Sequence, residues 1–108
     1  MKHLFLGEAD VPRPRKAPFS PSNTSSKSPA ELMAEIQYVL NNNHISYYVK
    51  KFSLVCSSVV NDETIQFELE VNAVPRLKET YFVHPTRIAG NEWTFKSVVD
   101  QLFVELKL

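Results

Sequence analysis

The last nineteen residues of the chain, Gly90 to Leu108, place their apolar side chains at the spacing of one helix face. The residues of this face are Phe95, Val98, Val99, Leu102, Phe103 and Leu106. Such spacing is typical of an amphipathic helix that buries one side. Asn91 or Thr94 can cap the free N–H groups at its start, and Glu92 suits the positive end of the helix dipole. We therefore predict that the chain ends in a helix, packed on an apolar surface of the same domain.

A second helix is predicted over residues 29–41. Ser28 can cap its first turn, Pro29 suits the first helical position, and Glu31 completes a capping box. The apolar residues again share one face: Leu32, Met33, Ile36, Val39 and Leu40. The asparagines at 41–43 tolerate the left-handed conformation that often ends a helix.

Between the helices, apolar and polar residues alternate, which is the pattern of half-buried strands. Four strands are predicted, at residues 45–50, 52–57, 65–72 and 80–88, the last interrupted by Pro85. The third is the clearest, because its odd-numbered residues are apolar while Glu68 and Glu70 face the other way. The expected fold class is α+β: a four-stranded antiparallel sheet with an N-terminal and a C-terminal helix on one face, in two layers.

The first part of the chain differs in composition from the rest. Residues 1–27 form a Pro/Ser-rich basic segment, predicted to be an extension or linker, and residues 28–108 the folded domain. The zero net charge hides a split, because residues 1–30 carry five basic and two acidic residues, whereas residues 31–108 carry seven and ten. A folded part with a net charge of −3 argues against nucleic acid as a partner.

No motif for catalysis, a metal or a cofactor is present. Gly7 and Gly90, the two glycines, cannot form a phosphate-binding loop. The three histidines and the single cysteine lack the spacing of zinc ligands, and Cys56 falls on the inward-facing set of its strand. No apolar run is as long as a membrane span. We expect a soluble cytoplasmic domain with no catalytic residue, no metal and no cofactor.

Several segments, in order, resemble the kinase-associated-1 domain: SSKSPAELMAEIQYVL, FSLVC, IQFELEV, PRL, RIAGNEWTFKSVVDQL and ELKL. This domain closes the microtubule-affinity-regulating kinases and the maternal embryonic leucine-zipper kinase. The resemblance covers residues 25–108 and is most specific at Phe67–Val71, at Arg87-Ile88-x-Gly90 with Trp93 and Lys96, and at Glu105–Leu108. The family's antiparallel sheet with a helix at each end of the chain agrees with the periodicity.

The resemblance implies a non-catalytic regulatory and targeting domain at the C-terminus of an ATP-binding serine/threonine protein kinase, a transferase. Its implied partners are acidic phospholipids such as phosphatidylserine, at the inner face of the plasma membrane, and its own kinase domain, which it restrains by autoinhibition. The alternative is a subunit-docking module that holds a regulatory protein subunit, as in the related C-terminal domain of AMP-activated kinases.

Six basic residues are candidates for binding the lipid headgroups or another anion: Lys50, Lys51, Arg76, Lys78, Arg87 and Lys96. Glu68 and Glu70 are explained by a solvated strand face, with contact to a basic protein surface as the alternative. His84 would add charge only at mildly acid pH. Trp93 is predicted to wedge into the core at the start of the last helix, rather than to anchor in a membrane.

Overall fold

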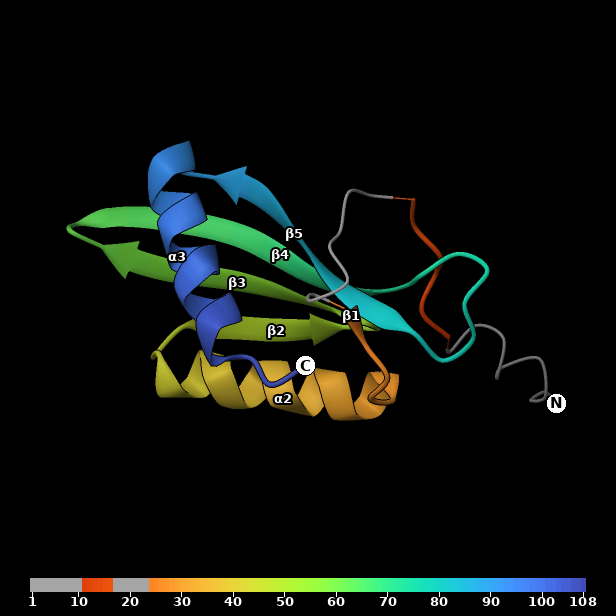
Figure 1. The fold of residues 1–108 in the computed structure, drawn as a ribbon. Helices are drawn as coiled ribbons and strands as arrows, with labels where there is room; N and C mark the ends of the chain where they lie inside the picture. Colours follow the sequence, from red (N-terminus) through yellow and green to blue (C-terminus); the bar gives the residue numbers. More distant parts are fainter. Residues whose placement is uncertain (1–10, 17–23) are drawn as a thin grey trace, which may run out of the picture.

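The computed structural model describes residues 11–16 and 24–108, which fold into a sheet with two helices (Figure 1). In chain order the elements are β1 (Thr24–Ser25), α2 (Pro29–Asn42), β2 (Ser46–Lys50), β3 (Ser53–Val60), β4 (Glu63–Ala73), β5 (Tyr81–Ala89) and α3 (Glu92–Glu105). The strands pair antiparallel in the order β1-β5-β4-β3-β2. The predicted α+β class, with two helices and an antiparallel sheet, is confirmed.

The prediction of four strands is wrong, because the sheet has five. The additional strand, β1, consists of Thr24 and Ser25, which pair with Phe82 and Tyr81 of β5. It falls within the segment predicted to be an extension or linker. Two residues are too few to show an alternating pattern, so the pairing depends on a partner strand far away in the chain.

The β3–β4 turn consists of Asn61 and Asp62, whose φ values of 51° and 67° are left-handed. Two such residues give the turn type that suits the twist of a tight hairpin, and Asn and Asp tolerate it well. β5 runs continuously through Pro85, where an interruption was expected. Proline is tolerated on a strand with an open side, and among the residues that the structure describes β1 pairs with β5 only at Tyr81 and Phe82.

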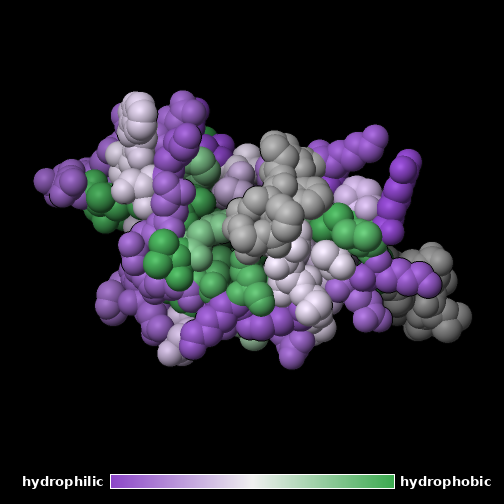
Figure 2. Space-filling view, viewed as in Figure 1, coloured by the Kyte–Doolittle hydropathy of each residue, from purple (hydrophilic) through white to green (hydrophobic). Residues whose placement is uncertain are grey.

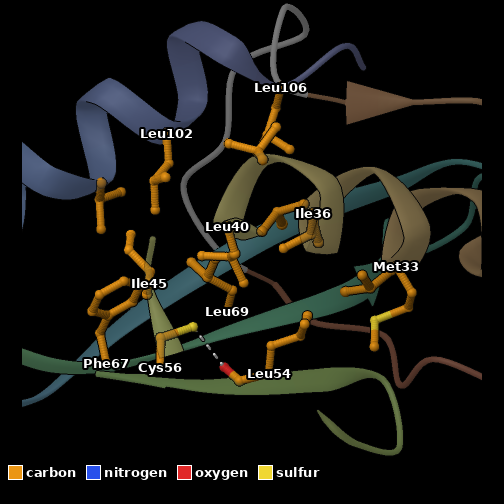
Figure 3. Packing of buried hydrophobic residues seen from close by; sticks show 14 of the residues in the cluster. Met33, Ile36, Leu40, Ile45, Leu54, Cys56, Phe67, Leu69, Leu102 and Leu106 are labelled. Atoms are coloured by element: carbon orange, nitrogen blue, oxygen red, sulfur yellow. Dashed lines mark hydrogen bonds between the residues drawn. The ribbon is translucent and has the colours of Figure 1, made fainter. Parts of the chain in front are cut away.

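One apolar core joins both helices to the same face of the sheet (Figure 3). Ile36 and Leu40 of α2 and Leu102 of α3 point towards Leu69 of β4. The fully buried apolar side chains of β4 are those predicted to face inward: Ile65, Phe67, Leu69 and Val71. Cys56 is buried in the same cluster, as predicted. The helices therefore form one layer, and the other face of the sheet carries the polar side chains of the alternating strands.

The helix starts follow the predicted caps. Ser28 Oγ accepts a hydrogen bond from the Glu31 amide at 3.1 Å, while the Ser28 amide donates to Glu31 Oε1 at 2.9 Å. Asn91 caps α3 by accepting from the amides of Trp93 and Thr94 at 2.8 and 3.2 Å.

The last three residues are not helical, which corrects the prediction that the chain ends in a helix. Leu106 is extended, with φ −69° and ψ 132°. The amide of Lys107 donates to Glu35 of α2 at 3.0 Å, and Leu106 is buried in the core. Because residues 106–108 leave the helix, the end of the chain turns along α2. Another turn of helix would not bring it there.

Candidate functional site

The fold divides the six candidate basic residues between the two ends of the sheet. Because neighbouring strands are antiparallel, the β2–β3 turn and the β4–β5 loop lie at the same end. Lys50 and Lys51 lie at that turn, and Arg76 and Lys78 in that loop. Arg87 and Lys96 lie towards the other end, on the last part of β5 and on the first half of α3.

We call Lys50, Lys51, Arg76 and Lys78 the basic end of the sheet. All four side chains are exposed, and Leu77 between the last two is 57% exposed. Residues 50–52 and 74–80 carry one acid, Glu79, so their net charge is +3. Hydrophilic side chains project in Figure 2 at the end where the β4–β5 loop lies in Figure 1. A positive surface with an exposed apolar side chain at its tip can bind a negatively charged interface.

The opposite end carries exposed apolar side chains beside its two basic residues. Trp93, in the first turn of α3, is 80% exposed, and Ile88 at the end of β5 is 51% exposed. The prediction that Trp93 wedges into the core is therefore wrong. The ring of Phe95 takes that place, 6.0 Å from the ring of Phe67 between centroids. Residues two apart on a helix point in nearly opposite directions, so one aromatic ring of this pair faces the sheet and the other faces solvent.

Arg87 does not present a free guanidinium group. Its Nη1 donates to the carbonyl oxygen of Gly90 at 3.0 Å and so braces the turn between β5 and α3. Among the six candidates, Arg87 thus has a structural partner within its own turn.

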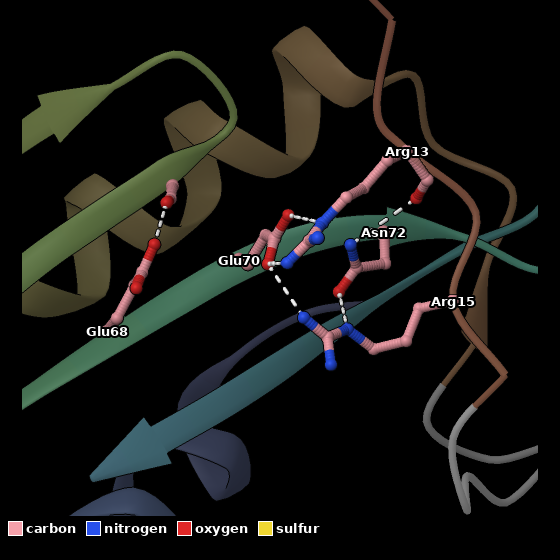
Figure 4. Close-up of polar contacts among 6 residues, drawn as sticks. Arg13, Arg15, Glu68, Glu70 and Asn72 are labelled. Carbon is pink, nitrogen blue, oxygen red and sulfur yellow. Dashed lines mark hydrogen bonds and ion pairs between the residues drawn. The ribbon is translucent and has the colours of Figure 1, made fainter. Parts of the chain in front are cut away.

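The acidic candidates Glu68 and Glu70 lie on the polar face of β4, as predicted, but both have partners (Figure 4). Arg13 donates to both carboxylate oxygens of Glu70, from Nε at 2.7 Å and from Nη2 at 3.0 Å. Arg15 Nη2 donates to Glu70 at 3.2 Å, and Ser53 Oγ donates to Glu68. The bonds from Arg13, and those from Asn72 and Arg15, hold the pKa of Glu70 below its ordinary value, although its partial burial opposes them.

Arg13, Arg15 and Asn72 were not among the predicted site residues. Both arginines lie in the segment predicted to be an extension or linker, and Asn72 was assigned to the wet face of its strand. The signal in the sequence is a matched spacing, since Arg13 and Arg15 are two residues apart, as are Glu70 and Asn72. Nothing local indicates that the two pairs meet. The domain boundary at residue 28 stays a prediction, while residues 13–15 and 24–25 lie against the sheet.

Residues 63–108 match the family model described as Kinase associated domain 1. This part of the chain is therefore similar to the kinase associated domain 1. It is also 26% identical, over 97 residues, to a probable serine/threonine-protein kinase, MARK-C, of Dictyostelium discoideum. That alignment covers 90% of this chain and 12% of the relative, so the chain spans a small part of the relative's length. Recognition of the family from the sequence is confirmed.

The part of the chain that matches the family model comprises β4, β5 and α3. It includes Arg76 and Lys78 of the basic end, but not Lys50 and Lys51. The basic end therefore joins residues from the matched part to a turn that precedes it. Arg13 and Arg15, which bind Glu70, also lie before the matched part.

Other titratable groups of the domain do not form a reactive site. Burial raises the pKa of the Cys56 thiol to about 12, so the thiol stays protonated. Burial, followed by the positive charge of Arg15, lowers the pKa of His84, so His84 stays neutral further into the acid range than expected. Across residues 11–16 and 24–108, no three His, Cys, Asp or Glu side chains come together as metal ligands; His3 lies outside these ranges. No helix in these ranges is long and apolar enough to cross a membrane.

Proposed function

We propose that this chain is a non-catalytic regulatory domain of a serine/threonine protein kinase, and that its basic end binds membranes rich in acidic phospholipids such as phosphatidylserine. The kinase assignment is supported by the family match and by the name of the relative. In the full-length protein, ATP binding and phosphoryl transfer would belong to a separate kinase domain. The observation that carries the membrane assignment is that Lys50, Lys51, Arg76 and Lys78 are all exposed at the same end of the sheet, where Leu77 is exposed as well.

The charge of the basic end, rather than the negative net charge of the folded part, decides whether this surface binds an acidic membrane. Each basic residue near an acidic membrane contributes about 1 kcal/mol. Charges further away than a Debye length of about 8 Å are largely screened at physiological salt. Acidic residues elsewhere on the domain therefore oppose binding weakly. The apolar side chain of Leu77 can enter the interface between its two basic neighbours.

Sedimentation with liposomes tests this proposal, with phosphatidylserine vesicles compared with phosphatidylcholine vesicles. Arg76→Ala/Lys78→Ala and Lys50→Ala/Lys51→Ala should each weaken binding to phosphatidylserine by about 30-fold, from about 1 kcal/mol for each charge. The matched control is Arg87→Ala/Lys96→Ala, which removes the same charge from the other end and should have a much smaller effect. Equal losses in all three variants, or no preference for phosphatidylserine at low salt, would rule the proposal out.

Autoinhibitory contact with the kinase domain is a second function, favoured by the exposed Trp93 and Ile88. Tryptophan is enriched at the centre of protein interfaces, and its exposure here is 80%. Glu68 and Glu70 remain candidates for a basic partner surface, although Glu70 would have to release Arg13 and Arg15.

Removing residues 28–108 from the full-length kinase should raise its activity, and Trp93→Ala should raise it in part. Unchanged kinase activity would exclude autoinhibition by this domain. A stable complex with another protein subunit would favour the alternative function, a subunit-docking module.

A further inference from the structure

The end of β4 has a backbone edge that β3 does not cover. The last residue pair of β3 with β4 is Ser53 with Glu70, and the amide of Val71 donates to the Phe52 carbonyl at 2.8 Å. β4 continues to Ala73, with β5 on its other side. On the uncovered side, the Ala73 amide donates to the Arg13 carbonyl at 3.0 Å and its carbonyl accepts from the Arg15 amide at 3.2 Å. Residues 13–15 therefore bind this edge through one parallel bridge, between Pro14 and Ala73.

The side chains at this edge recognise two arginines at once (Figure 4). Residues two apart on a strand share a face, so Glu70 and Asn72 point the same way, as do Arg13 and Arg15. Arg15 Nε donates to Asn72 Oδ1 at 3.1 Å, and Asn72 Nδ2 donates to the Arg13 carbonyl at 3.3 Å. Asn72 is fully buried, and residues 13–15 satisfy both ends of its amide group. Buried polar groups are normally hydrogen-bonded, and Asn72 would lose both of these partners if residues 13–15 left the edge.

The occupant is held in a way that permits exchange. The Arg13 side chain remains 65% exposed and that of Arg15 29% exposed, and exposed ion pairs are individually weak. The segment then depends on being part of the same chain, which gives it an effective concentration of the order of millimolar. Pro12 is buried beside Arg13, where the segment closes one wall of a cleft of about 340 Å³ with Lys51 and Glu68. A separate peptide with the same spacing can make the same backbone and side-chain contacts.

We propose that Glu70, Asn72 and the backbone of Ala73 form a docking site for extended peptides with arginines two residues apart. Residues 11–16 are its intramolecular occupant, and an Arg-x-Arg peptide of another protein displaces them. The mode is the addition of a strand to a sheet edge, where the backbone supplies affinity and alternate side chains supply specificity. This site adjoins the basic end, because Lys50 and Lys51 line the same cleft as Arg13 and Glu70. Its contacts with the arginines come from Glu70 and Asn72, which are not part of the basic end.

The test uses the full chain and follows the Ala73 backbone amide and the Asn72 side-chain amide by NMR. Arg13→Ala/Arg15→Ala should empty the site, shift both resonances and increase hydrogen exchange at Ala73 by about tenfold or more, since that amide loses its acceptor. A peptide with the sequence of residues 11–16, VPRPRK, should then restore the shifts at millimolar concentration. The wild-type chain should bind it at least about tenfold more weakly, because its own segment competes.

Two controls separate recognition from charge or misfolding. Lys16→Ala/Lys78→Ala removes the same charge without touching Glu70 or Asn72 and should leave both resonances in place. A peptide with alanine at both arginine positions should not bind the emptied site, and Glu70→Gln should weaken binding of VPRPRK. Resonances of core methyl groups report whether each variant is folded. If Arg13→Ala/Arg15→Ala leaves the Ala73 and Asn72 resonances unchanged, or if VPRPRK does not restore them in the folded variant, the proposal is wrong.

Discussion

Gly90 connects β5 to α3 in a conformation that few other residues can adopt. Its φ is +104°, outside the range of ordinary side chains. A Cβ atom at this position would lie 2.6 Å from Ile65 Cδ1 and 2.8 Å from the carbonyl oxygen of Thr64. The close approach brings the start of α3 against β4, where Glu63 binds it.

Gly90→Ala should therefore destabilise the domain strongly. Backbone strain alone costs about 1–3 kcal/mol, and the contact with the Thr64 carbonyl adds to it because a backbone atom cannot move aside easily. Urea unfolding followed by circular dichroism measures the loss. Thr86→Ala, an exposed substitution on the preceding strand β5, is the control and should change the free energy of unfolding by less than about 0.5 kcal/mol. A Gly90→Ala variant as stable as wild type would contradict the observed backbone conformation.

At the scale of elements, the start of α3 is held by two sets of hydrogen bonds: those within its own N-cap and those to β4. Asn91 accepts hydrogen bonds from the amides of Trp93 and Thr94. Glu63 of β4 accepts from the Asn91 amide at 2.9 Å and from Thr94 Oγ1 at 3.1 Å. The cap and the strand together determine which face of α3 meets the sheet, and hence why Phe95 is inside and Trp93 outside.

Asn91→Ala should lower the free energy of unfolding by about 1 kcal/mol, the usual cost of losing an N-cap. Asn91→Ser should recover most of that loss, because the hydroxyl oxygen can accept the same bonds. Thermal unfolding of the three proteins side by side provides the measurement. If serine were no better than alanine, the cap would not be what holds the start of α3.

At the scale of the molecule, one face of the sheet is covered by helices and the other carries a titrating cluster. His84 pairs with Glu70 in the sheet register, and Arg13 and Arg15 bind that glutamate. The pKa values of His84 and Glu70 are both lowered, the first chiefly by burial and the second chiefly by its bond with Arg13. Both shifts make the folded state bind protons less readily than the unfolded chain.

Stability should therefore fall in two stages as the pH is lowered. The unfolded chain takes up a proton at His84 near an ordinary pKa of about 6.5, before the folded chain does, so the first loss begins there. The ion-pair contribution of Glu70 is present above its ordinary pKa of about 4.3 and is lost as the pH falls through its lower folded pKa. Urea midpoints between neutral and acid pH should show both stages. His84→Gln should remove the first and Arg13→Ala/Arg15→Ala much of the second; two unchanged profiles would refute this account.

Local patterns in the sequence determined the two helices, the Ser28 cap, the inward face of β4 and the buried place of Cys56. Each depends on neighbours a few residues away, so periodicity of three to four or of two records it directly. The family resemblance likewise rests on ordered short segments, and the match of residues 63–108 confirms it.

Only the tertiary structure decided the fifth strand, the binding of Arg13 and Arg15 to Glu70, the exposure of Trp93 and the division of the six basic residues between two ends of the sheet. β1 has two residues, and the parallel bridge involves Pro14 and Ala73 alone. Both are too short to show a periodic pattern of apolar residues in the sequence. These pairings join residues more than fifty positions apart, and whether they form depends on where the turns bring the strand ends. The order of residues in the sequence cannot reveal these pairings, because they form only once the whole sheet has folded and brought the distant segments together.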